Sequence, residues 1–379
     1  MIKVAMVAHL GELSGAGTAL IDKAVNISRE QFEPILILPE DSELADLARC
    51  RGLAPHIISN PQTAMVDTHS IIAKIKILSE RRAYVQRLRR FFKQNNIDLV
   101  FVNSTASIFP GIAAKKAGLP ILWMVHEVLE NPSLSTRVKM AYIRRNANSI
   151  VWDSNLGKEL FPPAPNTPSL VCPNFVDTNR FQPKQTEFSA SGAPLTILCN
   201  GPFPRKGADV FLNAAKRVAA TTQRPCAFVL IGPEMPQHAD FCKNLHDIAQ
   251  QPELKGKVTF AGIQKDVPTL LRNADIFVSA SRNEAYPIIV LEAMAAKTPI
   301  ICTDVGDCAI IVGKNNERGA LVPPENPDRI AEAILDAIDH PQQTQQRAQK
   351  ALDWILESYS GNKCWKPLEE LMLKTAARA

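Results

Sequence analysis

The sequence lacks any long uncharged hydrophobic segment. No run approaches the ~18 apolar residues that a membrane-spanning helix needs. The apolar run at the start, residues 1–9, is interrupted by Lys3, is too short for the core of a secretory signal and has no cleavage site after it. The sequence therefore predicts a cytoplasmic protein without a membrane-spanning helix.

Paired cysteines and an Asp-x-Asp pair are also missing. None of the eight cysteines belongs to a Cys-x-x-Cys pair, and most lie in apolar stretches such as Ile197-Leu198-Cys199. They are predicted to be buried core thiols in a reducing compartment, not zinc ligands or disulfides. No metal site and no cofactor are expected.

Length and composition are those of an ordinary globular protein. The chain has 379 residues, 46% hydrophobic and 21% charged, which fits two domains of roughly 180 residues, each with a full core. The net charge of +5 is uneven, because residues 1–150 hold 19 Lys and Arg against 13 Asp and Glu, and the remainder holds 24 against 25. The N-terminal half is therefore expected to meet an anionic surface or substrate.

Apolar β-rich runs alternate with helical patterns along the chain, which predicts an α/β protein with mostly parallel sheets. The predicted strands of the first half are 2–8, 34–38, 55–58, 98–102, 120–125, 149–153 and 169–172. Those of the second half are 195–200, 226–232, 257–261, 275–279, 299–303 and 320–322.

A stretch of Pro, Ser and Gly, residues 183–194, separates the two series and is predicted to be a linker. The predicted domains are two doubly wound, Rossmann-like units, 1–182 and 195–359, with the C-terminal helix 360–379 joining the first. Ligands of such sheets bind at the carboxyl ends of the strands, here in a cleft between the domains.

The strongest candidate site is a polar loop after a predicted strand, which carries Glu284 and runs into an apolar helix. Pro287 suits the first turn of that helix, and the free N–H groups at its start, around Tyr286 and Ile288, would meet phosphate or sugar oxygens. Glu292 lies within the helix, where a carboxylate needs a partner such as two ribose hydroxyls. As two isolated glutamates, they would be better explained as a helix-favouring residue and a solvated loop residue.

Three further segments are candidates. Arg205 and Lys206 stand between a strand and a helix, where adjacent cations favour a diphosphate over the alternative of a solvated basic turn. Gly15-Ala16-Gly17 follows the first strand; it is either an anion-binding turn or an ordinary strand-to-helix connection. His126 ends a predicted strand, a position that makes a binding role as reasonable as a structural one.

The loop and helix together resemble the retaining glycosyltransferases of family 4, whose signature is Glu, seven residues, Glu and then Ala-Met-Ala. Here it is Glu284, Glu292 and Ala293-Met294-Ala295, with Ala285 in place of the usual Gly. Lys206-Gly207 is similar to the Lys-Gly loop of that family. The resemblance covers nearly the whole chain and is strongest from 195 to 325.

The resemblance implies the GT-B fold, two Rossmann-like domains with a cleft between them. It implies a metal-independent hexosyltransferase that uses a UDP- or GDP-sugar and retains the anomeric configuration. Lys206 and Arg205 would stabilise the leaving diphosphate, Glu284 would lie near the reacting sugar, and Glu292 would hold the ribose. His126 would face the donor sugar, and residues 15–17 would cap the donor phosphates or line the acceptor site.

The acceptor would be a glycan, a lipid-linked sugar or a small molecule in bacterial polysaccharide or glycoconjugate biosynthesis. Residues 71–93 predict a basic amphipathic helix, which either packs on its own sheet with a solvated basic face or also contacts anionic lipid on the inner face of the membrane. Nucleic acid is not expected as a partner. The alternatives to transfer are a sugar-nucleotide epimerase on the same fold and a non-catalytic nucleotide-sugar-binding protein.

Overall fold

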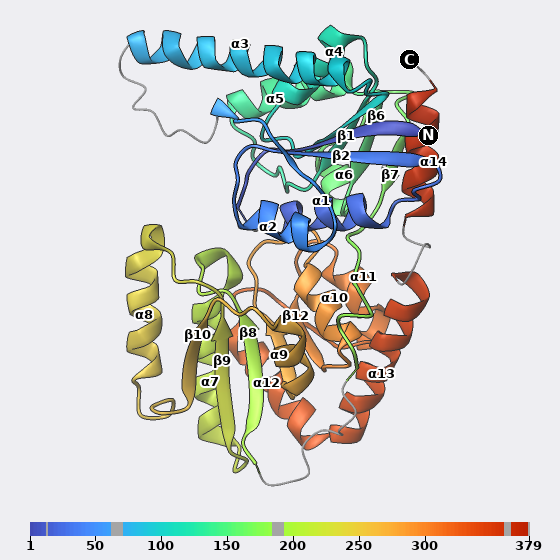
Figure 1. The fold of residues 1–379 in the computed structure, drawn as a ribbon. Coiled ribbons are helices and arrows are strands. Elements are labelled where there is room, and N and C mark those ends of the chain that lie inside the picture. The colour runs from blue at the N-terminus through green and yellow to red at the C-terminus, as the bar shows by residue number, and fades with distance from the viewer. Residues whose placement is uncertain (13, 62–70, 184–192, 360–364, 378–379) are drawn as a thin grey trace. The chain divides into compact units, whose positions relative to one another are not determined.

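The chain folds into two compact units in a computed structural model that describes residues 1–12, 14–61, 71–183, 193–359 and 365–377 (Figure 1). One unit comprises Met1–Phe175 with Gly361–Ala379, and the other comprises Val176–Ser360. Each is built on one parallel sheet with helices, so the predicted α/β class is confirmed.

The N-terminal unit contains a seven-stranded parallel sheet in the order β3-β2-β1-β4-β5-β6-β7. Its strands are β1 (Ile2–Ala8), β2 (Phe32–Leu38), β3 (His56–Ile57), β4 (Leu99–Asn103), β5 (Ile121–Val125), β6 (Ser149–Trp152) and β7 (Ser169–Val171). Its helices are α1 (Gly15–Asn26), α2 (Glu43–Cys50), α3 (Ile71–Gln94), α4 (Phe109–Ala117), α5 (Leu134–Asn146), α6 (Asn155–Leu160) and α14 (Lys366–Ala376).

The sheet of this unit is buried on both faces. Alternate residues of β1 enter different cores: Val4 and Met6 pack with α1, α2 and α14, whereas Ala5 and Val7 pack with α3, α4 and α5. This double burial explains why the predicted strands are continuous apolar runs without polar alternation. β2 begins two residues earlier than predicted and includes Pro34, which pairs only with β1, since β3 meets β2 at its last two residues.

The C-terminal unit contains a six-stranded parallel sheet in the order β10-β9-β8-β11-β12-β13. Its strands are β8 (Leu195–Asn200), β9 (Cys226–Ile231), β10 (Val258–Gly262), β11 (Ile276–Ser279), β12 (Ile300–Thr303) and β13 (Ala320–Val322). Its helices are α7 (Ala208–Thr221), α8 (Ala239–Ala249), α9 (Val267–Asn273), α10 (Ile288–Ala295), α11 (Cys308–Val312), α12 (Pro327–Asp339) and α13 (Pro341–Ser358), with 3-10 turns η2 (Pro204–Lys206), η3 (Pro236–His238) and η4 (Lys314–Asn316).

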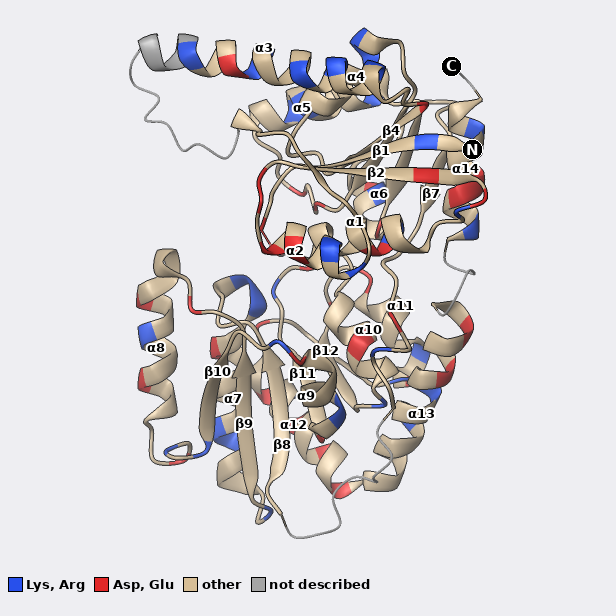
Figure 2. Ribbon diagram, in the orientation of Figure 1, with Lys and Arg blue, Asp and Glu red and all other residues tan. Residues whose placement is uncertain are grey.

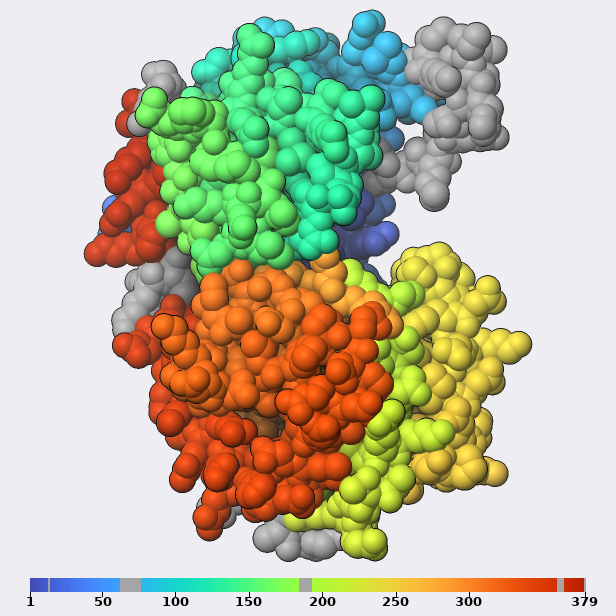
Figure 3. Space-filling model, turned by 180° about the vertical axis from the view of Figure 1, so that it is seen from behind, coloured from blue at the N-terminus to red at the C-terminus, as the bar shows by residue number. Residues whose placement is uncertain are grey.

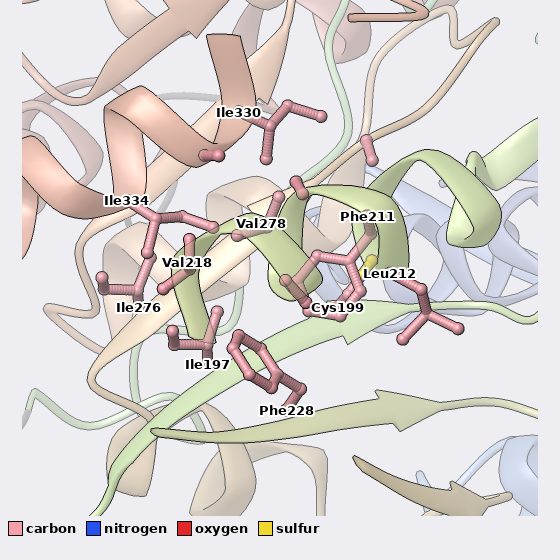
Figure 4. Close-up of a cluster of buried hydrophobic side chains, with 14 of the residues drawn as sticks. Ile197, Cys199, Phe211, Leu212, Val218, Phe228, Ile276, Val278, Ile330 and Ile334 are labelled. Atoms are coloured by element: carbon pink, nitrogen blue, oxygen red, sulfur yellow. The ribbon is translucent and has the colours of Figure 1, made fainter. Parts of the chain in front are cut away.

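A single apolar cluster joins α7 and α12 to one face of this sheet (Figure 4). Phe211 of α7 and Phe228 of β9 meet edge to face with ring centroids 6.2 Å apart, and Ile330 and Ile334 of α12 belong to the same cluster. The predicted Rossmann-like architecture is confirmed in both units, and all thirteen predicted strands are present.

The C-terminal helix α14 belongs to the N-terminal unit (Figure 3, red). Trp365, Leu368 and Met372 are buried in the same core as β1 and α1. The chain leaves this unit after Phe175, seven residues before the predicted boundary at 182. Most of the predicted linker, residues 184–192 of 183–194, lies outside the described residues.

None of the helices in the described part of the chain is long and apolar enough to cross a bilayer. The basic segment predicted as a helix at 71–93 is α3, which is confirmed as a helix of 24 residues.

Replacement of Trp365 by Ala tests how firmly α14 is docked. Trp365 is 2% exposed and its ring lies 5.2 Å from that of Phe175. We expect Trp365→Ala to lower the free energy of unfolding of the N-terminal unit by about 3–5 kcal/mol, measured by urea titration. Lys366→Ala, at an exposed position next to it, should change it little; equal effects would contradict the docking.

Candidate functional site

The candidate donor site is built where two neighbouring parallel strands end. β8 pairs with β11, with Ile197 opposite Ile276 and Cys199 opposite Val278. The strand order reverses here, because the chain runs from β8 outward to β9 on one side and returns to β11 on the other. Ligands of open α/β sheets bind at such a switch point, and the turn after β8 and the loop after β11 therefore lie together.

Glu284 is bound by both cations of the segment 204–207 after β8, which we call the basic turn. Lys206 Nζ donates to Glu284 Oε1, Arg205 Nη1 lies 3.0 Å from the same oxygen, and Ser281 Oγ donates to it at 3.2 Å. The side chains of Glu284 and Lys206 are 11% and 16% exposed, whereas that of Arg205 is 55% exposed. The structure thus brings three predicted site residues into one cluster, of which Lys206 and Glu284 are largely buried.

Two glycines fix the backbone of this cluster. Gly207 ends the basic turn with φ +66°, and a Cβ there would lie 2.0 Å from the carbonyl oxygen of Ala280. Gly306 has φ +55°, and a Cβ there would lie 2.1 Å from the carbonyl oxygen of Glu284. Both glycines have left-handed backbone and approach a neighbouring carbonyl oxygen more closely than a Cβ would allow. The basic turn therefore packs directly on Ala280, and the segment after β12 packs directly on the loop of Glu284.

The remaining predicted donor residues lie around the start of α10. Pro287 is the N-cap residue and Ile288 is the first residue of the helix. Glu292 is half-buried one turn further on, and the hydroxyl of the buried Tyr286 is hydrogen-bonded to that of Tyr359 at the end of α13. This bond ties the segment before α10 to the end of α13.

Cysteines near the cluster are not nucleophiles. Burial raises the pKa of Cys199, at the end of β8, to about 12, and it raises that of Cys308, at the start of α11, to about 12 as well. Their thiols stay protonated at neutral pH. Both cysteines are core thiols, as the sequence predicted.

A second polar cluster lies at the carboxyl ends of the strands of the N-terminal unit. His126 Nδ1 is 3.0 Å from Asp153 Oδ2, and His126 Nε2 is 2.8 Å from Asn103 Oδ1. Asn103 Nδ2 donates to the carbonyl oxygen of Ala16 at 3.0 Å, which directs its Oδ1 toward His126. Both ring nitrogens of His126 are therefore engaged within this unit, and a contact with a donor sugar would have to replace one of these bonds.

The glycine-rich turn has its own structural bonds. The N–H of Gly17 donates at 3.2 Å to Oγ of Ser14, which is the N-cap residue of α1. A Cβ at Gly17 would lie 3.0 Å from the side chain of Leu44, so a close contact with α2 also explains this glycine. Gly15, which is exposed, and the half-buried Ala16 are the positions left for a ligand in this turn.

Glu127 and Ser104 stabilise the same end of the sheet. Glu127 accepts hydrogen bonds from Ser104 Oγ, from the N–H of Thr105 at 3.0 Å and from that of His126 at 3.2 Å. Ser104 has φ +120°, a strained conformation for a non-glycine residue that these bonds hold in place. Nearby, burial lowers the pKa of His9.

The polar residues that bind the candidate residues were not predicted from the sequence. Asn103 ends β4 and Asp153 directly follows β6, so the strand-end rule that selected His126 would have selected them too. Asp209 and Arg282, which bind each other beside the basic turn, gave no comparable signal. Within the described residues, no group of three or more His, Cys, Asp or Glu could hold a metal ion.

Two family models match consecutive parts of the chain. The model described as Glycosyltransferase Family 4 matches residues 13–180, and the model described as Glycosyl transferases group 1 matches residues 182–354. The chain belongs to the family 4 glycosyltransferases. The resemblance found in the sequence is therefore confirmed, and the protein is a glycosyltransferase.

Two curated relatives of this glycosyltransferase are bacterial enzymes. It is 23% identical over 359 residues to the UDP-Gal:alpha-D-GlcNAc-diphosphoundecaprenol alpha-1,3-galactosyltransferase of Escherichia coli, covering 89% of this chain and 88% of the relative. It is 23% identical over 312 residues to the phosphatidyl-myo-inositol mannosyltransferase of Mycolicibacterium smegmatis, covering 80% of this chain and 77% of the relative.

A solved structure shares the fold over the full length. The crystal structure of Anabaena Alr3699/HepE in complex with UDP and glucose matches with a TM-score of 0.83 at 19% identity, covering 99% of this chain and 100% of the other. The GT-B fold predicted from the resemblance is confirmed.

Gly207→Ala tests the close approach at the basic turn, with Gly256→Ala as its matched control. Both glycines are left-handed, with φ +66° and +76°, but no atom lies within 4 Å of a Cβ at 256. Both variants should lose about 1–2 kcal/mol for the backbone conformation. Gly207→Ala should lose a further ~1–3 kcal/mol from the overlap. Urea unfolding measures both, and equal losses would show that the turn can move away from Ala280.

Proposed function

We propose that this glycosyltransferase is a metal-independent, retaining hexosyltransferase that takes its sugar from a nucleoside diphosphate. The observation that carries the proposal is the cluster of Lys206, Arg205 and Glu284 at the switch point of the C-terminal unit. Two cations on one turn, one of them largely buried, suit a diphosphate. A UDP-sugar is the first candidate donor, because the name of the E. coli relative includes UDP-Gal and the Anabaena structure contains UDP.

The chemistry needs little more than these groups. Lys206 and Arg205 stabilise the negative charge that develops on the leaving diphosphate as its bond to the anomeric carbon breaks. The acceptor hydroxyl attacks from the face that the diphosphate leaves, and its proton passes to a phosphate oxygen. No protein nucleophile is required, which agrees with the buried, protonated cysteines near the cluster.

Glu284 has two tasks in this proposal. It holds Lys206 in place before the donor arrives, and its carboxylate is directed toward the reacting sugar. Glu292 binds the ribose from α10. Tyr286, Pro287 and Ile288 surround the diphosphate at the start of that helix, where Ile288 donates its backbone N–H to a phosphate oxygen. His126 and the turn Gly15-Ala16-Gly17 contribute to binding from the N-terminal unit.

The acceptor is a lipid-linked sugar or another glycan in bacterial glycoconjugate biosynthesis. Two relatives carry lipid acceptors in their names, diphosphoundecaprenol in one and phosphatidyl-myo-inositol in the other. Epimerisation is not favoured, because the curated relatives are named as transferases.

The basic helix α3 offers a contact with the membrane in which such an acceptor lies. It buries one side in the core through Tyr84, Leu88 and Phe92. Its exposed side carries Lys and Arg at several turns (Figure 2). We propose that this side binds anionic lipid headgroups.

A donor panel with Lys206→Met tests the transfer. Nucleoside diphosphate release should occur with one of the UDP- or GDP-sugars, and Lys206→Met should lower kcat about 10²–10³-fold, since it removes a charge that stabilises the leaving group. Lys216→Met, which removes a half-exposed lysine on α7, should leave kcat unchanged. NMR of the product should show the donor's anomeric configuration; inversion would refute retention.

The remaining outcomes separate the alternatives. Glu284→Ala should abolish release from the same donor. An isomerised nucleotide sugar without an acceptor product would establish the epimerase. Binding of a donor without turnover would establish a non-catalytic binding protein. Absence of donor binding would overturn the roles of Lys206 and Glu292.

Charge reversal on α3 tests the membrane contact separately. Arg82 and Arg90 are both exposed. The variant Arg82→Glu with Arg90→Glu should weaken binding to phosphatidylglycerol vesicles by at least about thirtyfold, because each lost basic residue contributes about 1 kcal/mol near an anionic surface and each added carboxylate is repelled by it. Co-sedimentation measures this, with Arg329→Glu and Lys350→Glu as the control pair. Equal binding of all forms would mean that α3 only packs on its sheet.

A further inference from the structure

Arg282 lies two residues before Glu284, and its guanidinium group has no donor left for a ligand. Arg282 Nη1 and Nη2 donate to the two carboxylate oxygens of Asp209 at 2.9 and 2.8 Å. Nε and Nη2 donate to the carboxylate of Glu325, the second at 3.0 Å, and Nη1 also donates to the carbonyl oxygen of Pro204 at 2.5 Å. A guanidinium has five N–H donors, and these five bonds use all of them.

The partners of Arg282 come from three separate segments. Asp209 is in the first turn of α7, Glu325 follows β13, and Pro204 begins the basic turn. Each bidentate pairing fixes the guanidinium plane as well as its position. Glu325 is held in a left-handed conformation with φ +57°, which is strained for a residue with a side chain. The fold keeps the carboxylate of this residue in contact with Arg282 although its backbone is strained.

Hydrogen bonds to backbone carbonyls also join the basic turn and the loop of Glu284, one in each direction. The N–H of Arg282 donates to the carbonyl oxygen of Arg205 at 2.8 Å. Arg205 Nη1 in turn donates to the carbonyl oxygen of Asn283 at 3.0 Å. The turn that carries Lys206 and the loop that carries Glu284 are thus connected through Arg282 by side chain and by backbone.

A third cation beside Lys206 and Arg205 would ordinarily be taken for another diphosphate ligand. The bonding of Arg282 argues against this, because a phosphate could gain a bond only by displacing a carboxylate or the carbonyl of Pro204. Asp209 and then Glu325 also raise the pKa of Arg282 above its usual value, so its charge is committed to these two partners. Arg205 is more exposed, and its guanidinium contacts Glu284 and the carbonyl oxygen of Asn283 through Nη1 alone.

We propose that Arg282 is a positioning residue, which holds the basic turn against the loop that carries Glu284, so that Lys206 lies where the leaving diphosphate forms. This inference rests on the proposed function for the role of Lys206. Arg282 itself does not touch the donor. Its removal should therefore affect the reaction through the placement of Lys206.

Arg282→Lys keeps the charge and removes the planar, five-donor geometry. A single ammonium group cannot bridge Asp209, Glu325 and Pro204, so the basic turn loses its fixed position. A displacement of about 1 Å costs on the order of 10²-fold in rate, and we expect kcat to fall by about that factor. The KM for the donor should change far less, because Lys206 acts on charge that develops in the transition state.

The matched control is Arg329→Lys on α12, where an exposed arginine is paired with Glu332. It is the same substitution in another ion pair and should leave kcat unchanged. Asp209→Asn is the milder second variant, which keeps the shape of the side chain and should lower kcat in the same direction. An unchanged kcat in Arg282→Lys, or a raised donor KM with kcat retained, would overturn the proposal, the latter by making Arg282 a donor ligand.

A measurement without donor separates this inference from the proposed function. If Arg282 positions Lys206, the urea midpoints of Arg282→Lys, Lys206→Met and the double variant should be non-additive, because the two residues share one network. Additive shifts would overturn the positioning role. If the unaltered protein released no nucleoside diphosphate from any donor, the proposed function would fail. The double-mutant cycle of urea midpoints would still decide whether Arg282 positions Lys206.

Discussion

The parallel pairing of β8 with β11 places Lys206 beside Glu284, although 78 residues separate them in sequence. Both strands end at the same edge of the sheet; β8 is followed by the turn that carries Lys206, and β11 by the loop that carries Glu284. A carboxylate that is 11% exposed is stabilised only if its partners satisfy it. Glu284 has three such partners, and the positions of the turn and the loop follow from them.

The charges of this cluster are balanced within the protein. Glu284 balances the positive charge of Lys206 and Arg205, so the turn can carry two adjacent cations without an unpaired buried charge. A diphosphate would bring its own negative charge to the same cations. Arg282, whose guanidinium is bonded by Asp209, Glu325 and the carbonyl of Pro204, would hold the turn in place during the proposed exchange.

In the N-terminal unit, polar groups that follow neighbouring strands also bind one another. His126, Asp153 and Asn103 form a bonded series that reaches the carbonyl of Ala16 at the start of α1. These residues come from three strands and one helix, and their mutual bonds fix the position of the glycine-rich turn. His126, with both ring nitrogens engaged, is first of all part of this framework, and the binding role proposed for it would require one of these bonds to be replaced.

The sequence by itself determined the class of fold, the strands and the central acidic and basic segments. Strands buried on both faces produce continuous apolar runs, and helices between them produce a different period, so these elements are encoded locally. The spacing of Glu284 and Glu292 is also local, since a loop and the helix after it contain both. Lys206 was found because adjacent cations between a strand and a helix form a pattern within a few residues.

Only the tertiary structure decided which groups meet. The bonds of Arg282 to Asp209 and Glu325 span 73 and 43 residues, and no local pattern in the sequence encodes them. The same holds for His126, whose partners come from β4 and from the end of β6. Strand order sets these contacts, because it determines which carboxyl ends are neighbours, and strand order is a property of the assembled sheet.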